Sequence, residues 1–204
     1  MGSEMCIRDS SQAQFRPISR LPLVSKILEK IAVRHWFLPF INNIDASQFA
    51  YLPRCGSGTT SALTIMYNSI LRYLDSKSGA IRLLALDFSK AFDRLPFQSI
   101  IQSSIFLKLP KQAIAWLMSY VNNRCQCVSV NDKYSSWRVL PSGVPQGSIL
   151  GPLLFSITLA SLEPLFNNSR MIKYADDITL LHFVRSAADD LLQRELDNLS
   201  LIHI

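Results

Sequence analysis

The chain has 204 residues, of which 49% are hydrophobic, and it carries a formal net charge of +6 at pH 7. This composition supports a substantial buried core and excludes a disordered chain. No uncharged apolar run reaches the roughly 20 residues that cross a bilayer, so we expect no membrane span. The basic balance favours a polyanionic partner, although a solvated charged surface is the ordinary alternative.

Both ends of the chain match one DNA tag. The sequence ATGTGTATAAGAGACAG carries the codons of residues 5–10, and its reverse complement carries those of residues 199–204. The tag resembles a transposase adapter used to build sequencing libraries, so we expect residues 1–10 and 199–204 to be adapter translation. Without residues 1–10 the chain has 20 basic and 13 acidic side chains, a net charge of +7. The remainder is therefore more basic than the whole.

An extended segment and a helix open the domain. Pro17 restrains the backbone of residues 15–19, and Arg16 lies just before it. Apolar side chains then recur at helical spacing over residues 21–37, which predicts a helix.

A glycine-containing loop, residues 48–60, precedes the next predicted helix. Thr59 or Thr60 can cap a helix that runs from residue 61 to about residue 74. Loops of this type often contact phosphate groups, although an ordinary helix entry is the commoner role.

The middle of the chain predicts one strand, two helices and a hairpin. The apolar run of residues 81–86 predicts a buried strand that delivers Asp87 at its C-terminal end. The helices are predicted over about 96–107 and 111–121, and the hairpin strands over 125–130 and 135–140. Cys125 and Cys127 have no second pair at zinc-ligand spacing, so we expect reduced core thiols and no disulfide framework.

A loop rich in proline and glycine follows the hairpin. Residues 141–148 contain two prolines and two glycines, which predicts a rigid loop whose backbone can approach a ligand closely. We predict a mostly buried helix over residues 149–166 and a last amphipathic helix over residues 187–196.

Residues 171–183 form the stretch that organises the chain. Two apolar runs flank Asp176 and Asp177, which predicts a hairpin with acidic residues at its tip. Adjacent carboxylates repel each other, so they need a compensating cation or strong hydrogen-bond donors, although a solvated turn is the alternative. Asp87 also lies at a strand end, so one sheet can bring the three acids together. Such a set suggests two divalent metal ions and in-line phosphoryl transfer.

Three motifs occur in a fixed order along the chain: Asp-Phe-Ser-Lys-Ala-Phe at 87–92, Ser-Gly-Val-Pro-Gln-Gly-Ser-Ile-Leu-Gly-Pro at 142–152, and Tyr-Ala-Asp-Asp at 174–177. Together they closely resemble a reverse transcriptase of the non-LTR, LINE-like retrotransposon type over nearly all of residues 15–198. The resemblance implies an α+β fold of the right-hand polymerase type. The fingers would take about 11–80 and 110–141, the palm about 81–109 and 142–198, and the thumb would be missing.

The resemblance also assigns roles to individual residues. Asp87, the backbone carbonyl of Phe88, Asp176 and Asp177 would bind metal, with the three carboxylates as the catalytic set. Residues that would contact the incoming nucleotide or template are Arg16, Phe92, Gln146, Gly147 and Tyr174, with Phe92 as a steric gate against ribose. Asp93 would have a structural role.

The function implied is RNA-directed DNA synthesis. Its cofactors would be two Mg²⁺ ions, with Mn²⁺ as a substitute, and its partners would be an RNA template, a DNA primer and deoxynucleoside triphosphates. Such an enzyme is expected inside the cell, in the nucleus; no oligomeric state is implied. An RNA-dependent RNA polymerase is the rival enzyme, but it would favour a carboxylate where Phe92 stands. The alternative from another class is an inactive retroelement remnant or a nucleic-acid-binding fragment.

Overall fold

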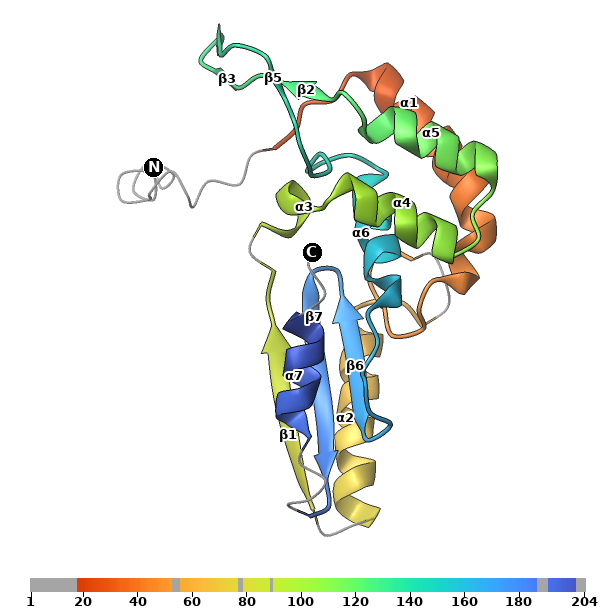
Figure 1. Cartoon of the computed structure of the whole chain (residues 1–204), viewed down its shortest axis with the longest axis vertical. Coiled ribbons are helices and arrows are strands. Elements are labelled where there is room, and N and C mark those ends of the chain that lie inside the picture. The colour runs from red at the N-terminus through yellow and green to blue at the C-terminus, as the bar shows by residue number, and fades with distance from the viewer. Residues whose placement is uncertain (1–17, 53–55, 77–78, 89, 187–190, 201–204) are drawn as a thin grey trace.

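A three-stranded antiparallel sheet forms the lower part of the molecule (Figure 1). The computed structural model describes residues 18–52, 56–76, 79–88, 90–186 and 191–200. The strand order is β1-β7-β6, and the strands are β1 (Ala80–Leu86), β6 (Ser169–Tyr174) and β7 (Asp177–Val184). Because β7 pairs with both of the other strands, it is the central strand of the sheet.

The hairpin predicted over residues 171–183 is confirmed as β6 and β7. Tyr174 pairs with Asp177, so Ala175 and Asp176 make a two-residue loop at its tip. Every residue of β7 after Asp177 is buried or half-buried, as its near-continuous apolar sequence requires. The acids therefore lie where a buried hairpin turns.

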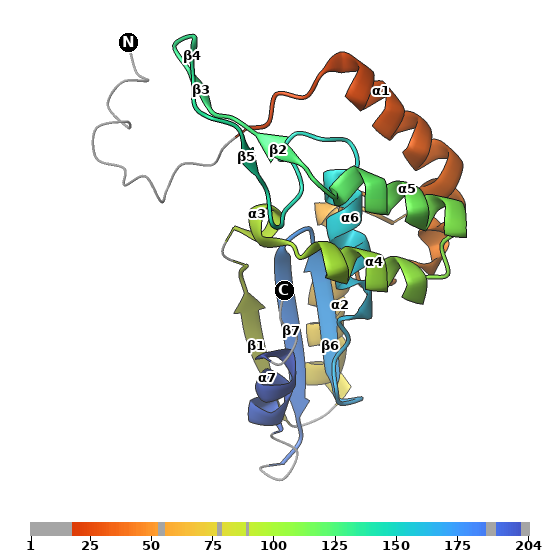
Figure 2. The same cartoon turned by 45° about the horizontal axis from the view of Figure 1, so that its top comes forward.

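Helices cover both faces of this sheet. The helix α2 (Thr59–Ser76) packs on one face, where Ala62 joins a cluster with Ile172 and Leu181. The helix α7 (Leu192–Ser200) lies across the other face (Figures 1 and 2), and Leu192 packs against the main core. Strand β1 is at the edge of the sheet and its side chains are half-buried or exposed, so the prediction of a fully buried strand is wrong.

The main core joins this sheet to a helical part. Its helices are α3 (Ala91–Arg94), α4 (Phe97–Phe106), α5 (Lys111–Val121), α6 (Gly151–Thr158) and the 3₁₀ turn η4 (Leu159–Ser161). Every residue of α6 is buried except Pro152. The predicted helices over 96–107 and 111–121 are confirmed. The one predicted over 149–166 is shorter, because the chain tightens into η4 and then leaves the helical path at Leu162.

The first helical region consists of α1 (Leu23–Ala32), a π-helical turn η2 (Val33–Phe37) and a 3₁₀ segment η3 (Leu38–Asn43). The helix is confirmed, but most of its large apolar side chains are exposed and Glu29 is buried against the core. The apolar stripe of α1 thus faces outward. Two helix starts also differ from prediction: α2 begins at Thr59, so Thr59 and Thr60 lie inside it, and the last helix begins at Leu192.

The predicted second hairpin is confirmed as two short ladders in one protruding arm. β2 (Cys125–Gln126) pairs with β5 (Arg138–Val139), and β3 (Ser129–Val130) pairs with β4 (Lys133–Tyr134). Cys125 is exposed and Cys127 is half-buried, so the prediction that these thiols lie in the core is wrong. Within the described ranges, no helix is long and apolar enough to cross a membrane.

Candidate active site

The predicted acids gather at one end of the sheet. Leu86 pairs with Ile178, so Asp87 and Asp177 are the next residues beyond this last pair on two neighbouring strands. Asp176 occupies the hairpin loop beside them. Asp87 and Asp177 are exposed and Asp176 is half-buried. The backbone therefore brings together the three carboxylates that sequence spacing leaves 89 positions apart.

This set fits a hard divalent cation in its donor chemistry, since carboxylate oxygens are the preferred ligands of Mg²⁺. As the side chains lie, however, the described part of the chain holds no group of three acidic, histidine or cysteine residues that could bind one ion. The exposed side chains of Asp87 and Asp177 can change rotamer at little cost, so side-chain rotation can bring their carboxylates closer to Asp176.

The proline- and glycine-rich loop lies beside the turn that follows Asp87. Gln146 donates from Nε2 to Asp93 Oδ1 over 3.1 Å, and its carbonyl accepts from the Ser19 amide over 2.9 Å. Gly143 has φ 90°, and a Cβ there would lie 2.5 Å from the Asp93 carbonyl oxygen. Only glycine allows this approach. Asp93 thus holds the loop in place, which agrees with the structural role expected for it.

Gly147, the neighbour of Gln146, is exposed and has φ 103°, in the region that favours glycine. Arg16 lies outside the described residues. The segment that follows it reaches this loop through the hydrogen bond from Ser19 to Gln146.

Phe88 and Phe92 both pack on Phe155 of α6. The Phe92 ring lies 5.1 Å from the Phe155 ring, centroid to centroid, and the Phe88 ring lies 6.2 Å from it. Both side chains are half-buried. One surface of Phe92 therefore packs against the core, and another is accessible. This position is compatible with a steric gate against ribose and also with a simple core contact.

Tyr174 and the loop that begins at Gln48 border the acids on the other side. Tyr174 lines a cavity of about 690 Å³ together with Phe49, Tyr51, Ser57, Gly58, Ser148 and Pro152, among others. Burial, and after it the Asp176 carboxylate and Tyr174, raise the pKa of Tyr51. Tyr51 therefore lies within electrostatic reach of Asp176. Sequence reasoning named this loop as a candidate but did not identify Tyr51, because an aromatic residue in a loop carries no periodic signal.

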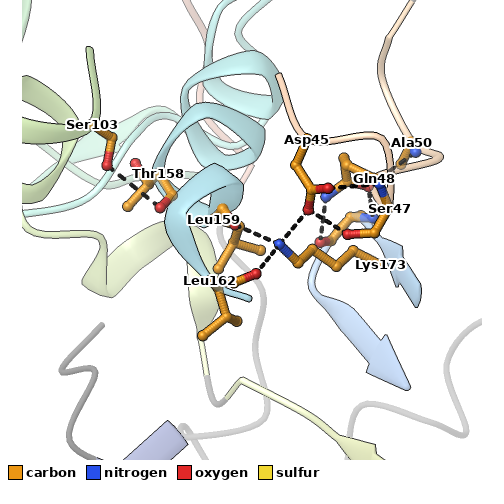
Figure 3. Close-up of polar contacts among 10 residues, drawn as sticks. Asp45, Ser47, Gln48, Ala50, Ser103, Thr158, Leu159, Leu162 and Lys173 are labelled. Atoms are coloured by element: carbon orange, nitrogen blue, oxygen red, sulfur yellow. Dashed lines mark hydrogen bonds and ion pairs between the residues drawn. The ribbon is translucent and has the colours of Figure 1, made fainter. Parts of the chain in front are cut away.

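Lys173, the residue before Tyr174, is fully buried. Figure 3 shows its ammonium between Asp45 and the carbonyl oxygens of Leu159 and Leu162. Nζ is 2.5 Å from Asp45 Oδ2 and 2.8 Å from the Leu159 oxygen. Three N–H donors thus meet three acceptors, which satisfies a charged lysine.

Burial and the partner's charge act in opposite directions on the pKa of each member of this pair. Burial would raise the pKa of Asp45, but Lys173 and hydrogen bonds from Ser47 outweigh it and hold this pKa below its ordinary value. Burial lowers the pKa of Lys173, although the carboxylates of Asp45 and Glu163 oppose the shift. The pair ties the strand that leads to the acids to the loop that contains Asp45, and the hydrogen bonds from Lys173 to the Leu159 and Leu162 carbonyls tie the same strand to η4.

Glu29 fixes the other end of α6. Its Oε2 accepts from the amides of Ile149, over 2.7 Å, and Leu150, over 3.3 Å, just before the helix begins. Its Oε1 accepts from the Tyr120 hydroxyl over 2.9 Å. A carboxylate at a helix N-terminus satisfies free amides and interacts favourably with the helix dipole. Glu29 thereby anchors α1 to the helix that follows the Gln146 loop.

These elements form a mixed helix and sheet fold in which three acids lie at one end of the sheet. Residues 7–200 match the family model described as reverse transcriptase (RNA-dependent DNA polymerase). The chain belongs to the reverse transcriptase family.

Curated relatives carry the same description. The chain is 33% identical over 189 residues to the probable RNA-directed DNA polymerase from transposon BS of Drosophila melanogaster, covering 85% of this chain and 20% of that protein. It is 34% identical over 183 residues to the corresponding protein from transposon X-element of the same fly, covering 87% and 20%. The chain therefore spans about a fifth of the length of these relatives.

A solved structure shares the fold. Telomerase from Candida tropicalis, in complex with a fragment of telomeric RNA, matches with a TM-score of 0.58 and 12% identity. The match covers 87% of this chain and 30% of that one. Since the identity is low, the likeness concerns the fold alone.

Proposed function

We propose that this chain is part of an RNA-directed DNA polymerase of a non-LTR retrotransposon, one that adds deoxynucleotides to the 3′ hydroxyl of a DNA primer on an RNA template. The observation that carries the proposal is the placement of Asp87, Asp176 and Asp177 at one sheet end. Membership of the family and the named function of its relatives support it. The positive net charge suits a nucleic-acid duplex.

In this proposal the three carboxylates and the Phe88 carbonyl hold two Mg²⁺ ions, for which Mn²⁺ can substitute. When bound, such ions stabilise the charge that develops in phosphoryl transfer. Gln146 and Gly147 contact template and nucleotide, and Asp93 keeps that loop in register through its hydrogen bond with Gln146. Arg16 contacts the triphosphate, and Tyr174 borders the nucleotide. Phe92 lies under the sugar and excludes a 2′ hydroxyl.

The wider assignment is a right-hand polymerase. In this proposal the sheet and the segments around residues 81–109 and 142–198 correspond to the palm, and the segments around 11–80 and 110–141 to the fingers. The helix α2 lies at the boundary: it precedes residue 80 but packs on the sheet. A thumb would lie outside this chain, and a retrotransposon polymerase would work in the nucleus.

The test compares two aspartates that have different roles in this proposal. In the protein expressed with its native flanking sequence, Asp176→Asn should reduce magnesium-dependent primer extension by orders of magnitude, because it removes a ligand charge. Asp93→Asn keeps an oxygen that can accept from Gln146 and should reduce extension far less. Equal extension by Asp176→Asn and wild type would contradict the assignment of Asp176, and absence of extension by wild type would favour an inactive remnant.

A further inference from the structure

One buried glutamine side chain holds the backbone of the acidic hairpin tip. Gln48 is 1% exposed. Its Oε1 accepts from the amides of Ala175, over 3.1 Å, and Ala50, over 3.0 Å, and its Nε2 donates to the Ala175 carbonyl over 3.4 Å. Two amide donors converge on one oxygen, which fixes the orientation of the side-chain amide. Figure 3 shows Gln48 beside Ala50 and close to Lys173.

Ala175 needs such a partner because of its backbone conformation. It has φ 57°, in the left-handed region that residues with a Cβ seldom adopt. It is also 6% exposed, so its amide and carbonyl cannot rely on solvent. A strained conformation persists only where its surroundings determine it. Gln48 meets both polar groups of this one residue, and Asp176 is the next residue along the chain.

The loop that carries Gln48 is itself tied to the strand that leads to the tip. Lys173 donates its amide to the Ser47 carbonyl over 2.8 Å and accepts from the Phe49 amide over 2.9 Å. The buried ion pair between Lys173 and Asp45 holds the same loop from its other end. Gln48 therefore has a fixed position relative to β6. Its hydrogen bonds to Ala175 can hold the hairpin tip in a fixed position as well.

We propose that Gln48 is a positioning residue: it sets the conformation of Ala175 and thereby the direction in which Asp176 projects. This inference rests on the proposed role of Asp176. A side-chain amide is suited to the task because it donates and accepts at once without charge, whereas a glutamate would only accept and would add a negative charge near three others. A purely structural role, in which Gln48 merely satisfies a buried loop, is the alternative.

The first measurement follows amide hydrogen exchange in the 204-residue chain. In Gln48→Met, which keeps side-chain length but neither donates nor accepts, the Ala175 amide should exchange at least about tenfold faster. The Lys173 amide, bonded to Ser47, should keep its protection. Unchanged Ala175 exchange in Gln48→Met would overturn the contact on which the proposal rests.

The second measurement uses primer extension by the protein with its native flanking sequence. Gln48→Met should lower kcat by between about tenfold and a hundredfold and change KM for the nucleotide less, because most of the proposed nucleotide contacts come from other elements. Ala175→Gly should restore part of the lost kcat in the double variant, since glycine adopts positive φ without strain. A structural role would not be rescued in this way, so absence of rescue would contradict positioning.

Two controls separate the possible failures. Ser104 is fully buried and donates to the Ile100 carbonyl, far along the chain from the tip. Ser104→Ala removes this buried hydrogen bond and should leave kcat unchanged. A loss of kcat in Ser104→Ala equal to that in Gln48→Met would assign the effect to stability and refute the proposal. Full activity of Asp176→Asn would instead refute the proposed function, and the exchange result would still report on the Gln48 contact.

Discussion

The Lys173–Asp45 pair allows a quantitative prediction about stability. Asp45→Asn leaves the ammonium of Lys173 buried without a counter-charge, and breaking a buried ion pair from one side costs about 3–5 kcal/mol. The Asp45 side chain is 14% exposed, so water can partly compensate. We therefore expect a loss near the lower limit, about 3 kcal/mol in the free energy of unfolding.

Replacing Lys173 in place of Asp45 should lower the free energy of unfolding by less than the sum of the contacts it removes suggests. Lys173→Met removes the buried charge and fills most of the volume, but it leaves the Leu159 and Leu162 carbonyls without their donor. Each unsatisfied buried acceptor costs about 1–3 kcal/mol. In the double variant with Asp45→Asn no charge is left unpaired, so its loss of stability should be smaller than the sum of the two single losses.

Urea unfolding of the 204-residue chain, followed by circular dichroism, measures these differences. Two outcomes would refute the reasoning: a loss below about 1 kcal/mol in Asp45→Asn, or additive losses in the double variant. The pH dependence gives an independent check. Because the pKa of Asp45 is lowered on folding, its contribution is complete at neutral pH and is lost as acidification passes the folded-state pKa, and this loss should be absent in Lys173→Met.

Two further predictions concern single side chains. Phe92→Val should raise the use of ribonucleotides relative to deoxynucleotides by about 10- to 100-fold while extension with deoxynucleotides largely persists; steady-state kcat/KM for each sugar measures the ratio, and an unchanged ratio in a folded, active variant would eliminate the gate. Glu29→Gln should cost about 2 kcal/mol in urea unfolding, because a neutral amide binds the start of α6 less strongly. It should also lower the pKa of Tyr120, which burial and then Glu29 raise; a tyrosine absorbance titration identical to wild type would contradict this.

The sequence predicted the parts of the fold in which local pattern and tertiary environment agree. The β6–β7 hairpin is an example, since apolar strands on both sides of two acids leave few other conformations. The burial of β1 could not be predicted from its apolar run, because an edge strand and a central strand share one sequence pattern. The outward apolar face of α1 is a similar case, since periodicity shows a stripe but not which way it faces.

The residues of the candidate site also fall into two groups, those that the sequence predicted and those that it did not. Its acids and loops have motifs, and the strand register brings the acids to one sheet end. Gln48 and Lys173 have no such signal. A buried lysine is rare, and a loop glutamine gains its role only when a residue 127 positions away folds against it. Such residues become visible only with the tertiary contacts.

Template-directed incorporation tests the central proposal most directly. The protein with its native flanking sequence is given a DNA primer on four RNA templates that differ only in the first unpaired base, together with Mg²⁺ and each deoxynucleotide in turn. If the protein is an RNA-directed DNA polymerase, each template should direct addition of its complementary deoxynucleotide. The same reaction with Asp176→Asn should give almost no product. Absence of extension by wild type on all four templates, or extension that ignores the template base, would contradict the proposal.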